Sequence, residues 1–205
     1  MAKSTKVVLI VAFLLILLDQ VSKFLIYDYF QVKHIGNEYY ITSPDRTEIS
    51  ILGDIVKFVY VENAGMAFGI QFGELKVALS LFSVIASIIL AYIILKIPNY
   101  PWIIQIAFGL ILAGAIGNLI DRLFYGMIFG YAPLFYGRVI DFIQVDIPDI
   151  NIGNIINYTH WPVFNVADSC VSVGVVLLIL FNRYLPNFAV IFKKKSQVDS
   201  SNGAD

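Results

Sequence analysis

The sequence is poor in the residues on which many metal and thiol sites depend. Its 205 residues include one cysteine, Cys170, and two histidines, His34 and His160. A single cysteine excludes an internal disulfide and a multi-cysteine metal site. The absence of a His-Glu-x-x-His motif argues against a zinc hydrolase of that type. We therefore predict no metal and no cofactor, and we interpret Cys170 as a packing residue and both histidines as solvated loop residues.

Charge is also scarce. Charged residues make up 14% of the chain, against about 25% in a typical soluble domain. Hydrophobic residues make up 59%, where roughly 45–50% is usual. This composition indicates an integral membrane protein and gives no reason to expect a nucleic-acid partner.

Four long apolar segments follow from the hydrophobic pattern, each near the roughly 20 residues that span a bilayer. The first follows Lys3 and Lys6 and therefore resembles a signal peptide. Because no small-x-small cleavage site comes after it, we interpret it as a retained helix. We predict transmembrane helices over about 7–27, 77–95, 102–123 and 164–184.

Lysines set the expected orientation of these helices. In a four-helix topology all the flanking lysines fall on one side of the membrane, and by the positive-inside rule that side is cytoplasmic. Both termini are then cytoplasmic, and the two long connections face outward. The lysines concerned are Lys3, Lys6, Lys96, Lys193, Lys194 and Lys195.

The two outward connections differ in composition. The first is rich in β-branched and aromatic residues over about 37–73, which predicts a small antiparallel sheet. The second, about 124–163, is rich in glycine and proline, and we predict a loop. The fold class is therefore an α-helical integral membrane protein, with four transmembrane helices and an outward β-rich connection between helices 1 and 2. We expect a single domain over 1–205 with a disordered polar tail at 196–205.

Two aspartates stand out because they lie at the ends of apolar segments. Asp168 falls in the first turn of the fourth segment, where an ionisable residue at the edge of hydrocarbon is a functional-site hypothesis. The alternative is structural: Asp168 complements the helix dipole and Asn165 is an N-cap. Asp141, upstream, is a second buried-looking acid. Two acids in such positions are what an aspartyl catalytic dyad requires.

Other polar residues accompany the third and first segments. Asn118 and Asp121 are three apart and share one helix face. Arg122 can reach the headgroups, bind a lipid phosphate or pair with a carboxylate. Taken alone, Asp121 and Arg122 are best interpreted as a structural ion pair or an interfacial anchor. Asp19 and Lys23, four apart, have the spacing of a structural ion pair.

These residues occur in motifs whose order resembles that of the lipoprotein signal peptidase family, the type II signal peptidases of bacteria. The resemblance extends from about residue 7 to about residue 184. The motifs are Asp19-Gln20-x-x-Lys23, the stretch Asn63–Gly69, Gly117-Asn118-x-x-Asp121-Arg122, Val139-x-Asp141-Phe142 and Phe164-Asn165-x-Ala167-Asp168.

The resemblance implies a membrane-embedded aspartyl endopeptidase that removes the signal peptide from prolipoproteins, cleaving before a diacylglyceryl-modified cysteine. It implies a monomer in the bacterial cytoplasmic (inner) membrane, in contact with lipids and with the active site at the outer face. It places the catalytic dyad on Asp141 and Asp168. Residues that hold the substrate or support the dyad would be Asn63, Asn118, Asp121, Arg122, Asn165 and Asp19.

One feature departs from the family pattern, and two other functions stay open. The connection Ile143–Val163 is longer than in many members and has no assigned role. The first alternative is a small transporter in which carboxylates form a proton or ion path. Against it, the polar residues gather at one face of the predicted bundle. The second is a lipid-modifying enzyme that uses Arg122 to bind phosphate.

Overall fold

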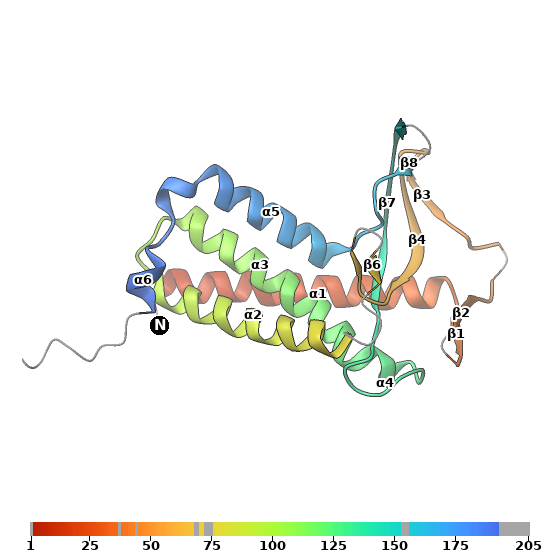
Figure 1. The fold of residues 1–205 in the computed structure, drawn as a ribbon, viewed down its shortest axis with the longest axis horizontal. Helices are drawn as coiled ribbons and strands as arrows, with labels where there is room; N and C mark the ends of the chain where they lie inside the picture. The colour runs from red at the N-terminus through yellow and green to blue at the C-terminus, as the bar shows by residue number, and fades with distance from the viewer. Residues whose placement is uncertain are drawn as a thin grey trace, which may run out of the picture.

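A computed structural model describes residues 2–36, 38–43, 45–67, 70–71, 76–152 and 156–192. The predicted polar tail at 196–205, the lysines at 193–195 and the end of the Asn63–Gly69 stretch lie outside these residues. Four long helices form a bundle, with the strands gathered at one of its ends (Figure 1). The helices are α1 (Lys3–Tyr29), α2 (Lys76–Lys96), α3 (Trp102–Ile120), α4 (Gly126–Ile128), α5 (Val166–Leu180) and α6 (Phe188–Ile191).

Helix lengths agree with a membrane-spanning bundle, with one short member. By length and apolar composition α1, α2 and the stretch Trp102–Ile128 can each cross a membrane. Helix α5 has 15 residues, about 22 Å at 1.5 Å per residue, which is less than the roughly 30 Å of hydrocarbon. The predicted end of this helix near residue 184 includes a separate 3₁₀ turn, Asn182–Tyr184.

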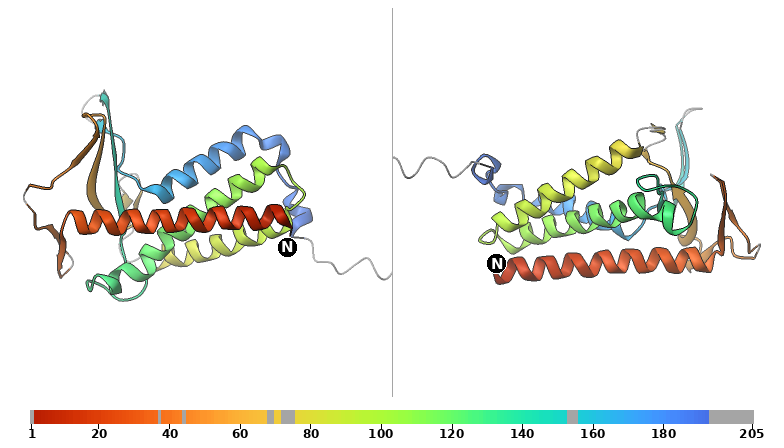
Figure 2. Two further views of the ribbon diagram at one scale, coloured as in Figure 1. Left: turned by 180° about the vertical axis from the view of Figure 1, so that it is seen from behind. Right: turned by 90° about the horizontal axis from the view of Figure 1, so that it is seen from below.

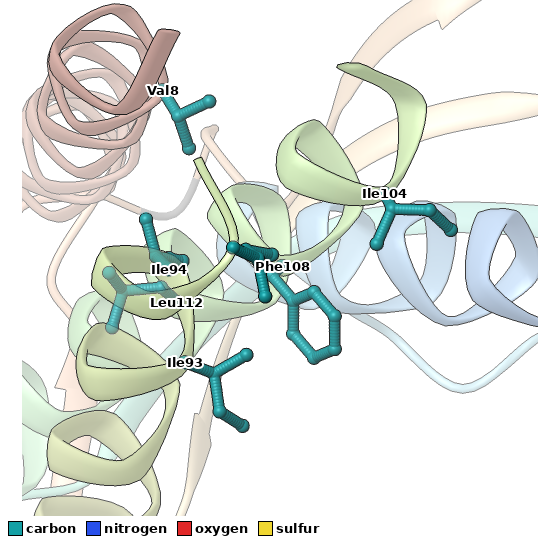
Figure 3. Close-up of a cluster of buried hydrophobic side chains, with 7 residues drawn as sticks. Val8, Ile93, Ile94, Ile104, Phe108 and Leu112 are labelled. Carbon is teal, nitrogen blue, oxygen red and sulfur yellow. The ribbon is translucent and has the colours of Figure 1, made fainter. Parts of the chain in front are cut away.

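Lipid and packing together explain why these segments are helical. A helix pairs its backbone N–H and C=O groups internally, and it must do so because hydrocarbon offers them no hydrogen-bond partners. Apolar side chains such as Phe13 and Phe82 remain exposed on the outside of the bundle. Inside, helices α1, α2 and α3 meet at a hydrophobic core (Figure 3). Its buried side chains are Val8, Ile93, Ile94, Ile97, Ile104, Phe108 and Leu112.

Close approach of α3 and α5 depends on glycine. A Cβ added at Gly114 would collide with the backbone oxygen of Ala167, and one at Gly174 would lie 2.8 Å from the oxygen of Ala107. Small residues at such a contact let two helix backbones pack directly against each other in lipid. This packing places the N-terminus of α5 beside α3.

The strands are β1 (Val32–Ile35), β2 (Glu38–Ile41), β3 (Ile49–Leu52), β4 (Val56–Asn63), β5 (Met66–Ala67), β6 (Ile70–Gln71), β7 (Val139–Ile152) and β8 (Ile156–His160). The main sheet is antiparallel with strand order β3-β4-β7-β8, while β1-β2 and β5-β6 are separate two-stranded pairs. The β-rich first connection is therefore confirmed.

Two sequence predictions are wrong here. The second connection is not simply a loop, because β7 and β8 occupy much of it and complete the main sheet. The prediction rested on glycines and prolines and missed the strand residues Val139–Ile143, of which the apolar Val139, Ile140 and Phe142 are buried. His34 is not a solvated loop residue, since it lies in β1 and its side chain is only 4% exposed.

The two ends of the bundle differ in content. The N-terminus of α1, the turn between α2 and α3, and α6 lie together at the end opposite the strands (Figures 1 and 2). The strands lie at the other end, where α3 passes into a π-helical turn, Asp121–Tyr125. All the candidate site residues lie at this second end.

Candidate active site

The start of α5 carries the first candidate acid. Asn165 is the N-cap of this helix, and its side chain accepts a hydrogen bond from the backbone N–H of Asp168 at 2.9 Å. In return, the Asp168 carboxylate accepts from the backbone N–H of Asn165 at 3.3 Å. This reciprocal pair is a capping box. The structural interpretation of Asn165 is thus confirmed, and the same bonds fix the Asp168 carboxylate.

Strand β7 carries the second candidate acid. Asp141 is 3% exposed, and its two carboxylate oxygens accept from two amides. The side chain of Asn165 donates to Oδ1 at 2.7 Å, and that of Asn63, on β4, donates to Oδ2 at 3.2 Å. Asn165 therefore bonds to both acids, through its side chain to Asp141 and through its backbone to Asp168.

Asn118 on α3 completes the set of donors. Its Nδ2 donates to Asp168 Oδ1 at 2.7 Å. Its Oδ1 accepts from the Lys23 ammonium at 3.1 Å and from the side chain of Asn165 at 3.2 Å. Because both cationic and amide donors occupy Oδ1, the amide orientation that presents Nδ2 to Asp168 is fixed.

A fully buried ion cluster lies beneath this site. The Lys23 ammonium is 2.8 Å from Asp19 and 2.7 Å from Asp121, and the three side chains are at most 1% exposed. Charges removed from water are stable only when they are paired and hydrogen-bonded. Gln20 adds donors to both carboxylates, at 3.1 Å to Asp19 and 2.9 Å to Asp121.

The ion cluster also holds the two elements that carry the acids. Asp19 accepts from the backbone N–H of Ala167 at 2.8 Å, in the first turn of α5. Asp121 accepts from the backbone N–H of Ile140 at 3.4 Å, next to Asp141 on β7. The cluster therefore joins α1 and α3 to both sides of the candidate dyad.

Arg122 brings positive charge to the site. Its guanidinium lies within electrostatic reach of Asp121, Asp141 and Asp168, and it makes a long 3.5 Å contact with the backbone oxygen of Asn118. A small concave space adjoins it. That space is lined by Asn63, Ala64, Gly65, Leu79, Ser80, Arg122 and Gly137.

Burial and charge act together on Asp141. Loss of hydration, added to the nearby charge of Asp168, raises the pKa of the Asp141 carboxyl to about 7, although the amides of Asn63 and Asn165 oppose the shift. A buried carboxyl beside another carboxylate holds its proton more strongly, because the charged form is disfavoured. Asp168 accepts hydrogen bonds from the side chain of Asn118 and from the backbone N–H of Asn165.

The structure brings the eight predicted site residues into one region, but one pairing is wrong. Asp121 pairs with Lys23 and not with Arg122, because a helix points consecutive side chains in different directions. The Asp19–Lys23 pair is confirmed. Sequence reasoning left Lys23 and Gln20 out of the site; their place in the Asp19-Gln20-x-x-Lys23 motif was the signal available.

Comparisons with known proteins show which family the chain resembles. A family model described as signal peptidase (SPase) II matches residues 11–183. Proteins named lipoprotein signal peptidase are similar to the chain. The one from Amoebophilus asiaticus is 36% identical, covering 84% of this chain and 76% of its own length. The one from Borrelia hermsii is 37% identical, covering 85% and 88%.

A solved structure is similar throughout its length. It is described as a bacterial membrane enzyme determined by the in meso method at 2.3 Å resolution. The TM-score is 0.62 and the sequences are 27% identical, with 94% of each chain covered. The arrangement of helices and strands is therefore shared with a membrane enzyme.

Proposed function

This chain belongs to the signal peptidase II family of bacterial membrane proteases, and from that premise we propose that Asp141 and Asp168 form its catalytic dyad. The observation that carries the proposal is the position of Asn165, which donates to both carboxylates. Burial and the nearby charge of Asp168 oppose ionisation of Asp141, so in this proposal the two carboxylates share a proton.

The proposed reaction is hydrolysis by an activated water. The ionised carboxylate takes a proton from a water, and that water attacks the scissile carbonyl. The protonated carboxyl polarises the carbonyl and then supplies the proton to the leaving amine. The two acids titrate as a coupled pair, in which the burial of Asp141 beside the charge of Asp168 favours Asp141 as the proton donor and Asp168 as the base.

The surrounding side chains have supporting roles in this proposal. Asn118 and Asn165 hold the carboxylates, and Asn63 donates to Asp141. Arg122, beside the concave space, has the charge and the position to hold a substrate carbonyl. The other two, Asp19 and Asp121, act through the buried ion cluster.

The proposed substrate is a prolipoprotein whose signal helix lies in lipid. Cleavage before a diacylglyceryl-modified cysteine suits a dyad at the end of the bundle, where a peptide leaves the hydrocarbon. Among the buried residues of the described helices, the charged ones are Asp19, Lys23 and Asp121, all near this end. A proton or ion path would need ionisable groups along the bundle, so this distribution favours the peptidase over a transporter.

The direct test of this function is cleavage of a defined substrate. Purified protein should be incubated with a lipidated prolipoprotein and with the same protein lacking the lipid, followed by mass spectrometry. We expect cleavage of the lipidated form, leaving the modified cysteine as the new N-terminus. Turnover of phospholipid without peptide cleavage would support the lipid-modifying alternative. Proton flux in liposomes that is lost in Asp168→Asn would support a transporter.

The orientation follows from the lysines and the position of the strands. We propose that the end of the bundle that carries the start of α1 and α6 faces the cytoplasm and that the dyad end faces outward. Single cysteines introduced at Asp45 and at Ser196, in a chain carrying Cys170→Ala, should react with an impermeant thiol reagent from opposite sides. Equal labelling of both from outside would contradict this topology.

Activity should resist EDTA and depend on pH. The sequence offers no metal-ligand motif, and the carboxyl groups of Asp141 and Asp168 are proposed to act directly on water and substrate. As pH rises above about 7, Asp141 loses the proton that it must donate, so cleavage should fall. At low pH both carboxyls are protonated and the base is lost. Complete loss of activity in EDTA that zinc restores would contradict the aspartyl mechanism.

A further inference from the structure

A further buried carboxylate with several partners lies on the face of the β4–β7 strand pair that is turned away from the dyad. The Glu62 side chain is 2% exposed and accepts three hydrogen bonds. The donors are His34 Nε2 at 2.6 Å, the Tyr60 hydroxyl at 2.7 Å and Arg138 Nη1 at 3.0 Å. We call these four residues the Glu62 cluster. None of them has a role in the proposed chemistry.

The Glu62 cluster and the dyad occupy opposite faces of the same two strands. Val61 pairs with Asp141, Glu62 with Ile140, and Asn63 with Val139. Because side chains alternate along a strand, Asn63 and Asp141 share one face. Glu62 lies on the other face, together with Arg138, which is two residues from Ile140. The ion pair behind the sheet thus spans the same two strands as the Asn63–Asp141 hydrogen bond in front of it.

The regular ladder at this point is short, since it consists of the three consecutive pairs at Val61, Glu62 and Asn63. The β4–β7 pairing is interrupted between Phe58 and Val61 by a bulge or irregularity. The pairs at Val61 to Asn63 are therefore separated from the regular pairs at Val56 to Phe58. A slip of one residue would turn every side chain to the other face, and Asp141 would leave the dyad.

Arg138 is held tightly at the start of β7. Its guanidinium lies over the Tyr131 ring at 5.3 Å, and its backbone N–H donates to the Tyr131 hydroxyl at 2.8 Å. The His34 ring stacks on Tyr131 at 4.2 Å. His34 Nδ1 is buried with no hydrogen-bond partner in the described part of the chain, which assigns the ring proton to Nε2, facing Glu62. The cluster is therefore a fixed, buried unit.

We infer that Glu62 is a positioning residue, which through its ion pair with Arg138 fixes the β4–β7 register that aligns Asn63 with Asp141. This inference rests on the proposed function, because alignment matters only if Asp141 is catalytic. Glu62 faces away from Asp141 and the dyad, so its contribution differs from that of a catalytic residue. Its loss should slow the chemical step and leave substrate binding largely unchanged.

The pH profile gives a readout that a purely structural role would not move. The groups acting on Asp141 are Asp168, Asn63, Asn165 and, by charge, Lys23 and Arg122. Around Glu62 are His34, Tyr60 and Arg138, with Tyr27, Tyr39 and Tyr131 nearby. The Asn63 hydrogen bond lowers the pKa of Asp141. If that bond is lost, Asp141 holds its proton more strongly and the alkaline limb of the kcat profile moves to higher pH.

The principal test is Glu62→Gln, which keeps the size of the side chain and removes its charge. With a lipidated prolipoprotein peptide as substrate, we expect kcat to fall about tenfold because the catalytic geometry is displaced, with KM nearly unchanged. The alkaline limb of the kcat profile should move to higher pH by about one unit, which is the effect of losing one hydrogen bond to a carboxylate. Asn63→Ala should give the same shift, and Glu62→Gln combined with Asn63→Ala should give no further shift.

Two comparisons control this test. Glu48→Gln makes the same chemical change at an exposed glutamate on the first connection, where Glu48 pairs with Lys57, and it should leave kcat and the profile unchanged. Arg138→Lys keeps the positive charge and should lie closer to the unaltered protein than Arg138→Gln. This Arg138 pair decides the question if Glu62→Gln does not fold.

The outcomes separate this inference from the proposed function. Failure of the unaltered protein to cleave any lipidated substrate would overturn the proposed function. If the unaltered protein cleaves through the dyad and Glu62→Gln keeps its rate and profile, the inference is wrong. A loss of folded protein with an unmoved profile in the folded fraction, or equal profiles for Arg138→Lys and Arg138→Gln, would also overturn it.

Discussion

Asp141→Asn and Asp168→Asn should each abolish cleavage almost completely. Asparagine keeps the size of the side chain, but it cannot take a proton from water or share one with its neighbour. A general acid or base contributes roughly 10²–10⁴-fold to a rate. Two residues that act as one catalytic unit are strongly non-additive, so the double variant should be hardly slower than either single variant.

The measurement is single-turnover cleavage of a lipidated prolipoprotein, normalised to folded protein extracted in detergent. Both single variants should fold, because Asn can still bond to Asn165 at either position. Additive losses in the double variant would show that the two acids act independently, and the shared-proton mechanism would then be wrong.

Lys23→Met should remove both stability and activity. The ammonium is completely buried and balances two carboxylates, and methionine fills similar space without the charge. Breaking a buried ion pair by removing one partner costs about 3–5 kcal/mol. Asp19 holds α5 through Ala167, and Asp121 holds β7 through Ile140, so both acid-bearing elements should loosen. Thermal unfolding in detergent and the cleavage rate measure the two losses.

A paired substitution distinguishes uncompensated charge from lost packing. Combining Lys23→Met with Asp121→Asn removes the ammonium together with one of its two carboxylates. This double variant should recover part of the lost melting temperature, because one buried unpaired charge is gone. A double variant no more stable than Lys23→Met would show that the ammonium matters for its packing and not for its charge.

Much of the site could be predicted because its motifs are local. The capping box needs only Asn165 and Asp168, three residues apart, and the Asp19–Lys23 pair needs only one helical turn. The strands of the first connection follow from runs of β-branched and aromatic residues. The observed strand β4, Val56–Asn63, lies within the predicted β-rich stretch of about 37–73.

The contacts that join distant segments could not be predicted. The pairing of Asp121 with Lys23 links α3 to α1, across 98 positions in sequence, and only the packing of the helices brings these residues together. The neighbouring Arg122 was the nearest opposite charge in sequence, which explains the wrong pairing. In the same way, His34 and Glu62 lie 28 positions apart on strands of different sheets, and only the folded chain brings their side chains to 2.6 Å.

The most direct test of the proposed dyad compares Asp141 with Asp121, two buried acids whose roles the sequence alone does not distinguish. Single-turnover cleavage of a lipidated prolipoprotein should be measured for Asp141→Asn and Asp121→Asn, each normalised to its folded fraction. Our account predicts that Asp141→Asn is almost inactive, while Asp121→Asn keeps an intermediate rate because Asp121 acts through the ion cluster. Near-native turnover in Asp141→Asn together with complete loss in Asp121→Asn would pair Asp121 with Asp168 and contradict the proposed dyad.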